Sequence, residues 1–445
     1  MGPMFIAIKG DDLVMQRVAI IGGGISGLAA AYFALGKGYA VDLFEKDDQW
    51  GGLAASFDFG GLSIEKYYHF ICGGDRRLIA LAGEIGLGSA LRFRPTQTAN
   101  FHNGRLYPFT SPLDLLRFRP IPLLSRIRFG FNIALSKYTK NWTELDGISA
   151  KEWLSRNVGT EAYEAVWQPH LKMKFGPYAE QISAAWIWHR IHRASSSRKG
   201  LFSPEKMGYF VGGSRTFLDK LVADISARGG RIHLRAELRE IRKNGGTFKL
   251  VFPSSNEEGY AKVVLALPLP ISAALLSALH PDYSRELRMI PFLAIVCGVF
   301  RLKKKVSDAF WLNISDPRIA SSGFIEYSNL NPLSEAAPET VLYIPSYVGT
   351  EDRLCQLDQD SLKAELFPVL RAVKPDLETA DVVDFRAFKH PYAQAVCSVG
   401  FKDKIPEYVT PLEDLYILDS TQLYPADRNL SALIVNAEKL IAGHF

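Results

Sequence analysis

The feature that most constrains the fold is a run of three glycines near the start of the chain, spaced as G-x-G-x-x-G. An apolar stretch, residues 18–21, comes directly before the run and predicts a buried strand, and the small residues after it favour a helix. In such a turn the first glycine permits the sharp bend, the second lets the backbone approach a pyrophosphate, and the third lets the helix pack on the strand. The diphosphate then lies at the helix N-terminus, where backbone N–H groups lack internal partners. The residues expected to contact a dinucleotide here are Gly22, Gly24, Ile25, Ser26 and Gly27.

The next segment indicates which dinucleotide is bound. A second strand is expected over residues 40–44, and it ends at Glu45, 18 residues after Gly27. At that distance a carboxylate can accept hydrogen bonds from the ribose hydroxyls of the adenosine. Gly51 and Gly52, followed by Leu53, come shortly afterwards. A nicotinamide-binding fold has no need for this extension, so the glycine pair favours FAD over NAD.

Residues 18–70 contain these features in one order, and in that order they resemble the FAD-binding fingerprint of a flavoenzyme superfamily. The superfamily contains flavin amine oxidases, protoporphyrinogen oxidases, phytoene desaturases and UDP-galactopyranose mutase. The resemblance implies an α/β fold with a Rossmann-like FAD-binding domain (GR2-type) and a second, discontinuous α+β substrate domain. It also implies that the glycine pair lets the chain pass close to the flavin side of the cofactor.

The order of the remaining segments indicates that both domains are discontinuous. A helix over 216–227 is followed by several short strands that end at 262–267. An apolar strand begins at residue 415, and a closing helix is expected over 430–442. We therefore expect an FAD-binding domain over 15–85, 206–268 and 405–445, and a substrate-binding domain over 86–205 and 269–404.

Two side chains are candidates for catalysis. Flavin oxidation depends mainly on the placement of the donor hydrogen and the exclusion of water, so no catalytic triad is required. The resemblance places the chain after the glycine pair near the flavin ring, so His69 is expected to bind flavin or substrate; the alternative is a histidine of the core. Some flavin amine oxidases carry a lysine that holds a water near flavin N5, and Lys174 is the candidate here. Burial of the Lys174 side chain would lower its pKa by desolvation. The alternative is that Lys174 lies on the surface, where it would have no role in catalysis.

Three charged residues near the C-terminus complete the expected cofactor site. The resemblance places an acidic residue near the FAD diphosphate at the end of the last strand, and Asp419 occupies that position. The segment 418–430 departs from the family's small residues. Within it, Asp427 is a candidate for the cofactor, although either Asp427 or Asn429 could simply cap the closing helix. Arg428 is expected to neutralise a phosphate or an anionic substrate.

Positive charge is concentrated in residues 91–140, which contain nine basic residues and one acidic residue, Asp114. The basic residues alternate with Leu, Ile and Phe, a pattern that suits contact with a membrane surface or capture of a lipid-linked or phosphorylated substrate. The alternative is a solvated face. No nucleic-acid motif accompanies this segment, so nucleic acid is not an expected partner. The basic residues are Arg92, Arg94, Arg105, Arg117, Arg119, Arg126, Arg128, Lys137 and Lys140.

The four cysteines are scattered, with neither a C-x-x-C motif nor the spacing of metal ligands. This pattern excludes a flavin disulfide reductase and a metal site. We expect a reduced, cytoplasmic chain. In one interpretation the chain associates with the inner face of the membrane. Residues 1–16 contain Asp11 and Asp12 and do not read as a signal peptide.

The predicted function is an FAD-dependent oxidoreductase, an oxidase or a desaturase/dehydrogenase. It would transfer hydride to flavin N5 from a small apolar molecule that is isoprenoid-like, ring-conjugated or lipid-linked. With one G-x-G-x-x-G run in the chain, a diffusible acceptor rather than NADPH is expected to exchange electrons with the flavin. Two alternatives are a sugar-nucleotide mutase of the UDP-galactopyranose mutase type and a non-catalytic FAD-binding protein.

Overall fold

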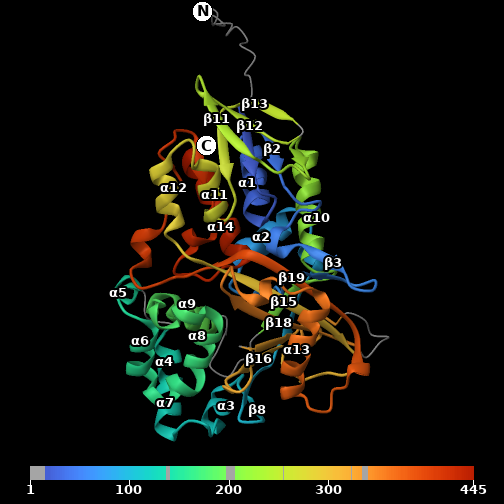
Figure 1. Ribbon diagram of the computed structural model, residues 1–445, viewed down its shortest axis with the longest axis vertical. Helices are drawn as coiled ribbons and strands as arrows, with labels where there is room; N and C mark the ends of the chain where they lie inside the picture. Colours follow the sequence, from blue (N-terminus) through green and yellow to red (C-terminus); the bar gives the residue numbers. More distant parts are fainter. Residues whose placement is uncertain (1–15, 137–140, 197–205, 254, 322, 333–338) are drawn as a thin grey trace, which may run out of the picture.

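The computed structural model describes residues 16–136, 141–196, 206–253, 255–321, 323–332 and 339–445. A five-stranded parallel sheet forms the upper part of the molecule in Figure 1, in the order β10-β2-β1-β14-β20. Its strands are β1 (Arg17–Ile21), β2 (Ala40–Phe44), β10 (Arg231–His233), β14 (Lys262–Leu265) and β20 (Leu415–Ile417). The parallel arrangement brings the carboxyl ends of distant segments to one edge.

Both faces of this sheet are covered, which explains why β1 reads as a continuous apolar run. Val18 and Ile20 point into a core shared with the helices, whereas Ala19 and Ile21 point into a core shared with a small antiparallel sheet. The helices are α1 (Ile25–Gly36), α2 (Arg76–Glu84), α10 (Ser214–Ala227) and α14 (Leu430–His444). The small sheet contains β11 (Glu240–Asn244), β12 (Thr247–Val251) and β13 (Asn256–Tyr260).

A seven-stranded sheet forms the second large layer, in the order β19-β15-β18-β17-β16-β7-β8. Neighbours in this sheet are antiparallel, except that β16 pairs in parallel with β7. Along β15, Val296 and Phe300 face α13 (Gln359–Val373), and Ile295 and Cys297 face the opposite core. The strands are β7 (Thr98–His102), β8 (Arg105–Pro108), β15 (Phe292–Leu302), β16 (Trp311–Ile314), β17 (Gly323–Glu326), β18 (Thr340–Val348) and β19 (Val382–Ala395).

A group of helices lies beside this sheet, at the lower left of Figure 1. Within it, α8 contacts β16 and β18 of the sheet and α9 packs against α4, α5 and α6. The helices are α3 (Pro112–Arg117), α4 (Leu123–Ser136), α5 (Thr143–Asp146), α6 (Ala150–Val158), α7 (Thr160–Ala162), α8 (Gln168–Phe175) and α9 (Ala184–Ser196). No helix in the described part of the chain is long and apolar enough to cross a membrane.

Three smaller units connect the layers. One is a sheet in which β9 (Lys206–Phe210) pairs with both β5 (Ile71–Cys72) and β6 (Leu91–Pro95), so it crosses the boundary expected between residues 85 and 86. Another is the hairpin of β3 (Ser56–Asp58) and β4 (Ser63–Glu65). The third is the pair α11 (Leu269–Leu276) and α12 (Pro281–Arg288), which follows β14.

The predicted α/β class is confirmed. Within the basic segment 91–140, the first part folds as β6, β7 and β8, and residues 112–136 contain the helices α3 and α4. Arg92 and Arg94 lie on β6 and Arg105 on β8. Lys137 and Lys140 lie outside the described residues.

Candidate functional site

The turn between β1 and α1 has the geometry that its glycines predict. Gly22 has a φ of +108°, a conformation that favours glycine, and a Cβ there would lie 2.4 Å from the carbonyl oxygen of Ala266. A Cβ at Gly27 would lie 1.9 Å from the carbonyl oxygen of Gly22. At Gly24, by contrast, a Cβ would meet no protein atom within 4 Å. The fold therefore requires glycine at positions 22 and 27, whereas Gly24 borders open space.

The second glycine pair lies against this turn. The Gly51 N–H donates to the carbonyl oxygen of Gly23 at 2.8 Å, and a Cβ on Gly52 would come within 3.3 Å of the Gly24 Cα. Both have positive φ, +115° for Gly51 and +55° for Gly52, and Leu53 follows in a short 3-10 turn. The pair thus borders the turn expected to bind the pyrophosphate.

Glu45 is buried at the carboxyl end of β2 and holds the same turn together. Its Oε2 accepts the Gly23 N–H at 2.7 Å, and its Oε1 accepts the Asp47 N–H at 2.9 Å. Burial raises the pKa of Glu45, while these two backbone donors oppose the shift. Each carboxylate oxygen retains a further lone pair, which can accept a hydrogen bond from a ribose hydroxyl.

The segment after β20 contains the acidic residue that is expected near the FAD diphosphate. Asp419 is buried, its Oδ1 accepts the Thr421 N–H at 2.7 Å, and burial raises its pKa. The Thr421 hydroxyl is buried without a hydrogen-bond partner among the described residues. Asn429, and not Asp427, caps α14, because its Oδ1 accepts the Ala432 N–H at 2.9 Å.

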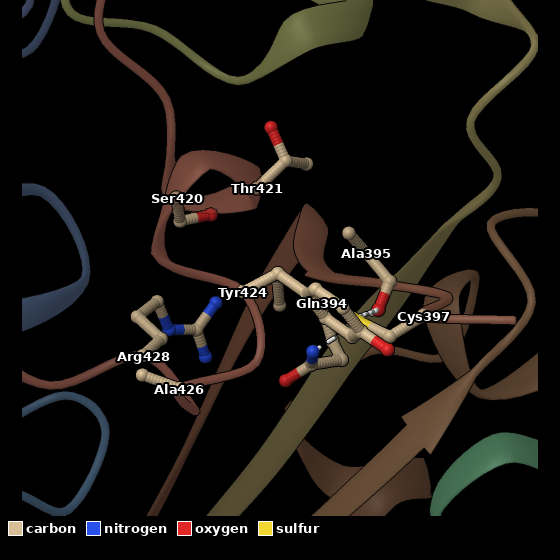
Figure 2. A pocket seen from close by; sticks show the side chains of 9 residues that line it. Gln394, Ala395, Cys397, Ser420, Thr421, Tyr424, Ala426 and Arg428 are labelled. Carbon is tan, nitrogen blue, oxygen red and sulfur yellow. Dashed lines mark hydrogen bonds between the residues drawn. The ribbon is translucent and has the colours of Figure 1, made fainter. Parts of the chain in front are cut away.

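The residues present therefore fit FAD. Gly24 borders open space, α1 begins without a side-chain cap, and a buried hydroxyl at Thr421 lacks a partner. Figure 2 shows a pocket beside Thr421, with the Arg428 guanidinium directed toward its middle. The pocket is lined by Ala393, Gln394, Ala395, Cys397, Ser420, Thr421, Tyr424, Ala426 and Arg428.

Asp427 lies beside Arg428 and pairs with two cations from the helical group. Its Oδ2 lies 2.7 Å from Arg190 NH1 and 3.6 Å from Lys174 Nζ. Burial alone would raise the pKa of Asp427, but Lys174, Arg190 and Arg428 together hold it well below its usual range. The structure thus places Asp427 as the counter-ion of this cluster instead of as a helix cap.

Lys174 is 7% exposed, so the alternative of a surface lysine is wrong. Its ammonium lies 4.8 Å from the centre of the Trp186 ring and 5.1 Å from that of Tyr347. Burial lowers the pKa of Lys174 to about 7, against the opposing attraction of Asp427. Lys174 and Arg190 line a second pocket together with Tyr68, His170, Trp311, Gly323, Ile325, Pro345 and Tyr347.

His69 is partly exposed and follows Tyr68, which lines the second pocket. Its Nδ1 lies 2.7 Å from the carbonyl oxygen of Tyr67, so the Nδ1–H donates there. Burial lowers the pKa of His69 and keeps the imidazole neutral, although Glu65 opposes the shift. Tyr68 packs edge-on against Trp311, with ring centres 5.5 Å apart. The binding of flavin or substrate by His69 therefore stays a prediction.

Several residues of the second pocket are absent from the sequence-based candidates. Arg190 lies in the basic string of residues 189–193, which was visible in the sequence as a charge pattern only. His170, Trp311 and Tyr347 come from α8, β16 and β18 and carry no local motif. In the described part of the chain, no group of three or more His, Cys, Asp or Glu side chains could hold a metal ion.

Comparisons with known proteins agree on one family. The profile of the family described as "Flavin containing amine oxidoreductase" matches residues 25–423. Coproporphyrinogen III oxidase of Staphylococcus aureus is 25% identical over 57% of this chain and 60% of its own length. The 15-cis-phytoene desaturase of Synechococcus elongatus is 21% identical over 94% of this chain and 93% of its own length.

Solved structures show the same fold. A putative protoporphyrinogen oxidase from Exiguobacterium sp. 255-15 superposes with a TM-score of 0.73 at 18% identity, covering 96% of this chain and 98% of the other. Reduced UDP-galactopyranose mutase gives a TM-score of 0.73 at 16% identity, covering 96% and 93%. At these identities the likeness establishes the fold alone.

Proposed function

This chain belongs to the family of flavin-containing amine oxidoreductases, which are FAD-dependent enzymes, and we propose that it oxidises an apolar small molecule. The observation that carries the proposal is the second pocket. The side chains of Trp311, Ile325 and Tyr347 give it an apolar wall beside the loop that contains Asp427 and Arg428. Such a wall suits an isoprenoid-like or ring-conjugated substrate, as pockets for small ligands are mostly apolar with a few polar groups.

Bound FAD supplies the hydride acceptor in this proposal. Residues of the chain hold the cofactor and exclude water, and the neutral His69 keeps its Nδ1–H on the Tyr67 carbonyl. The Asp427 carboxylate pairs with Arg190 and Lys174. We therefore do not count Asp427 among the residues that bind the cofactor directly. The residues proposed to bind FAD directly are Gly22, Gly24, Ile25, Ser26, Gly27, Glu45, Gly51, Gly52, Leu53, Asp419 and Arg428.

The named relatives support oxidation. They are called coproporphyrinogen III oxidase, 15-cis-phytoene desaturase and, in Zea mays, zeta-carotene desaturase. The mutase alternative rests on a structural neighbour at 16% identity, a likeness of fold. Oxidation is therefore the function we propose, and the mutase reaction is the competing outcome of its test.

Anaerobic mixing of the yellow protein with 15-cis-phytoene or coproporphyrinogen III tests the oxidation. We expect at least one of these probes to bleach the absorbance near 450 nm, because hydride transfer reduces the flavin without any added reductant. Buffer and vesicles without substrate serve as controls. Turnover of UDP-galactopyranose that requires prior reduction by dithionite, with no bleaching by either probe, would contradict the proposal in favour of the mutase.

A membrane surface is the proposed source of the substrate. The α3–α4 surface, defined by the exposed side chains of residues 113–135, carries an unusual number of large apolar groups. On α4, Leu123, Ile127, Phe131 and Leu135 recur every four residues and share one exposed face. Arg117 and Arg119, which precede α4, and Arg128 on α4 are also exposed. Apolar groups flanked by arginines suit insertion among the headgroups of anionic lipids. The remaining exposed apolar residues are Leu113, Leu116 and Leu124.

Flotation with vesicles of phosphatidylglycerol and phosphatidylcholine tests this surface. We expect Arg117→Glu/Arg119→Glu to reduce the membrane-bound fraction of the protein at least tenfold. Each arginine near an anionic surface contributes about 1 kcal/mol to the free energy of binding, and reversal of its charge loses about twice that amount. Arg126 is left in place because it donates to the carbonyl oxygens of Leu116 and Ile121.

The matched control is Arg353→Glu, which changes an exposed arginine outside the α3–α4 surface. Equal flotation of wild type and the double variant would remove the membrane from the proposal. A concentration-dependent dimer that Leu124→Ser/Phe131→Ser abolishes would reassign the surface to a second copy of the chain.

A further inference from the structure

We propose that the second pocket binds an anionic oxygen group, a carboxylate or a phosphate, on an otherwise apolar substrate, and that Lys174 and Arg190 hold this group. The inference rests on the proposed function, since it concerns the same pocket and narrows its substrate class. It distinguishes this chain's substrate from a pure hydrocarbon and from a cationic amine.

The two walls of the pocket differ in chemistry. The wall from the seven-stranded sheet carries Trp311 on β16, Ile325 on β17 and Tyr347 on β18. The wall from the helical group carries His170 and Lys174 on α8 and Arg190 on α9. Figure 1 shows α8 and α9 beside the sheet. A molecule that fills this pocket therefore meets apolar and aromatic groups on one side and cations on the other.

The cations outnumber their counter-ions. Asp427 is the one carboxylate among the described residues that forms an ion pair with Lys174 or Arg190, and it serves both. Its separation of 3.6 Å from Lys174 Nζ is too long for a normal hydrogen bond. A buried cation without a matching anion is costly, so an anionic ligand would complete this cluster.

A buried donor beside the cations also lacks an acceptor. Trp186 is 1% exposed, and its Nε1–H has no hydrogen-bond partner among the described residues. Its ring lies 4.8 Å from Lys174 Nζ and 5.1 Å from the guanidinium carbon of Arg190. Buried polar groups in proteins are almost always hydrogen-bonded, so the neighbourhood has donors in excess and is short of acceptor atoms. A carboxylate or phosphate supplies only acceptors.

Protonation of Lys174 links this binding to pH. Burial lowers its pKa to about 7 in the free protein, and a bound anion would raise it again. The charged and titratable groups that face Lys174 are Asp427, Arg190 and Arg428, with His170 and Tyr347 also lining the pocket. Burial lowers the pKa of His170 to about 3, so this side chain stays neutral over the range tested.

Titration calorimetry of the FAD-loaded protein with four ten-carbon probes tests the inference. At pH 6.5 we expect decanoate and decyl phosphate to bind at least tenfold more tightly than decanol, and decylamine to bind weakest. The two anions share the apolar chain, so a difference between them reports whether the natural group is a carboxylate or a phosphate.

Variants then assign the preference to named side chains. Lys174→Met is expected to lower the affinity for decanoate to that for decanol, and Arg190→Gln provides a second test should Lys174→Met fail to fold. In wild type the affinity for decanoate should fall about tenfold per pH unit between pH 7.5 and 8.5, because Lys174 must take up a proton to bind. Lys174→Met should show no such slope. Lys172→Met, an exposed lysine on the same helix, is the matched control.

The outcomes separate this inference from the proposed oxidation. Equal affinities for decanoate and decanol, or an unchanged preference in both variants, would overturn the anion site. Bleaching of the flavin by phytoene, a hydrocarbon without an anionic group, but not by coproporphyrinogen III, which carries carboxylates, would leave the oxidation standing and overturn the anion site. A clear anion preference in a protein that no probe reduces would support the anion site while the oxidation fails.

Discussion

Replacement of Gly24 by valine is expected to give a folded protein that has lost its yellow colour. A Cβ at this position meets no protein atom within 4 Å, so the substitution leaves the fold without a clash. The added side chain would instead occupy the space in front of the α1 N-terminus, where the diphosphate is proposed to lie. Loss of two charge-assisted hydrogen bonds, at about 1.5–3 kcal/mol each, weakens FAD binding by about 100-fold or more.

The ratio of absorbance at 450 nm to that at 280 nm measures this effect, and thermal unfolding of the FAD-free proteins reports the fold. Gly36→Val is the matched control, because Gly36 ends the same helix and also borders open space. Gly27→Val should behave differently and fail to fold, since its Cβ would lie 1.9 Å from the carbonyl oxygen of Gly22. A Gly24→Val protein with a full complement of FAD would show that the cofactor does not lie at this turn.

Replacement of Asp427 by asparagine is expected to destabilise the protein by more than the ~1 kcal/mol typical of an exposed pair, because it removes the carboxylate shared by the buried Lys174 and the partly buried Arg190. The substitution leaves Lys174 and Arg190 close together without their shared carboxylate. The destabilisation should be larger at pH 6 than at pH 9. Lys174, with a pKa of about 7, is charged at the lower pH and has lost its proton at the higher one.

Urea unfolding monitored by tryptophan fluorescence at both pH values measures this change. Asp414→Asn is the matched control, because Asp414 also pairs with a lysine, Lys262, at 2.8 Å but is 36% exposed. Lys262 keeps hydrogen bonds to the Tyr416 hydroxyl and the His444 carbonyl oxygen, so we expect a loss within about 1 kcal/mol. If Asp427→Asn lowered the free energy of unfolding by as little as the control does, the role of Asp427 as the counter-ion of Lys174 and Arg190 would be contradicted.

The cofactor turn could be predicted because its constraints are local. The backbone conformation at Gly22 and the contact between Gly27 and Gly22 are both properties of one short segment. The alternation along β1 and the helix after it also follow from neighbouring residues. The arrangement of the basic side chains in residues 91–140 could not be predicted in this way, since residues 91–108 fold as strands and residues 112–136 contain the helices α3 and α4. Charge alone does not determine secondary structure.

The sequence by itself therefore determined the strand–turn–helix unit, the acid at Glu45 and the family, because each depends on spacing along the chain. The tertiary structure decided what surrounds Lys174 and which groups share a pocket with it. Packing of α8 against β16 and β18 buries this lysine, and the loop before α14 brings Asp427 to it from more than half the chain away. Burial and charge pairing depend on neighbours in space, which spacing along a single chain does not specify.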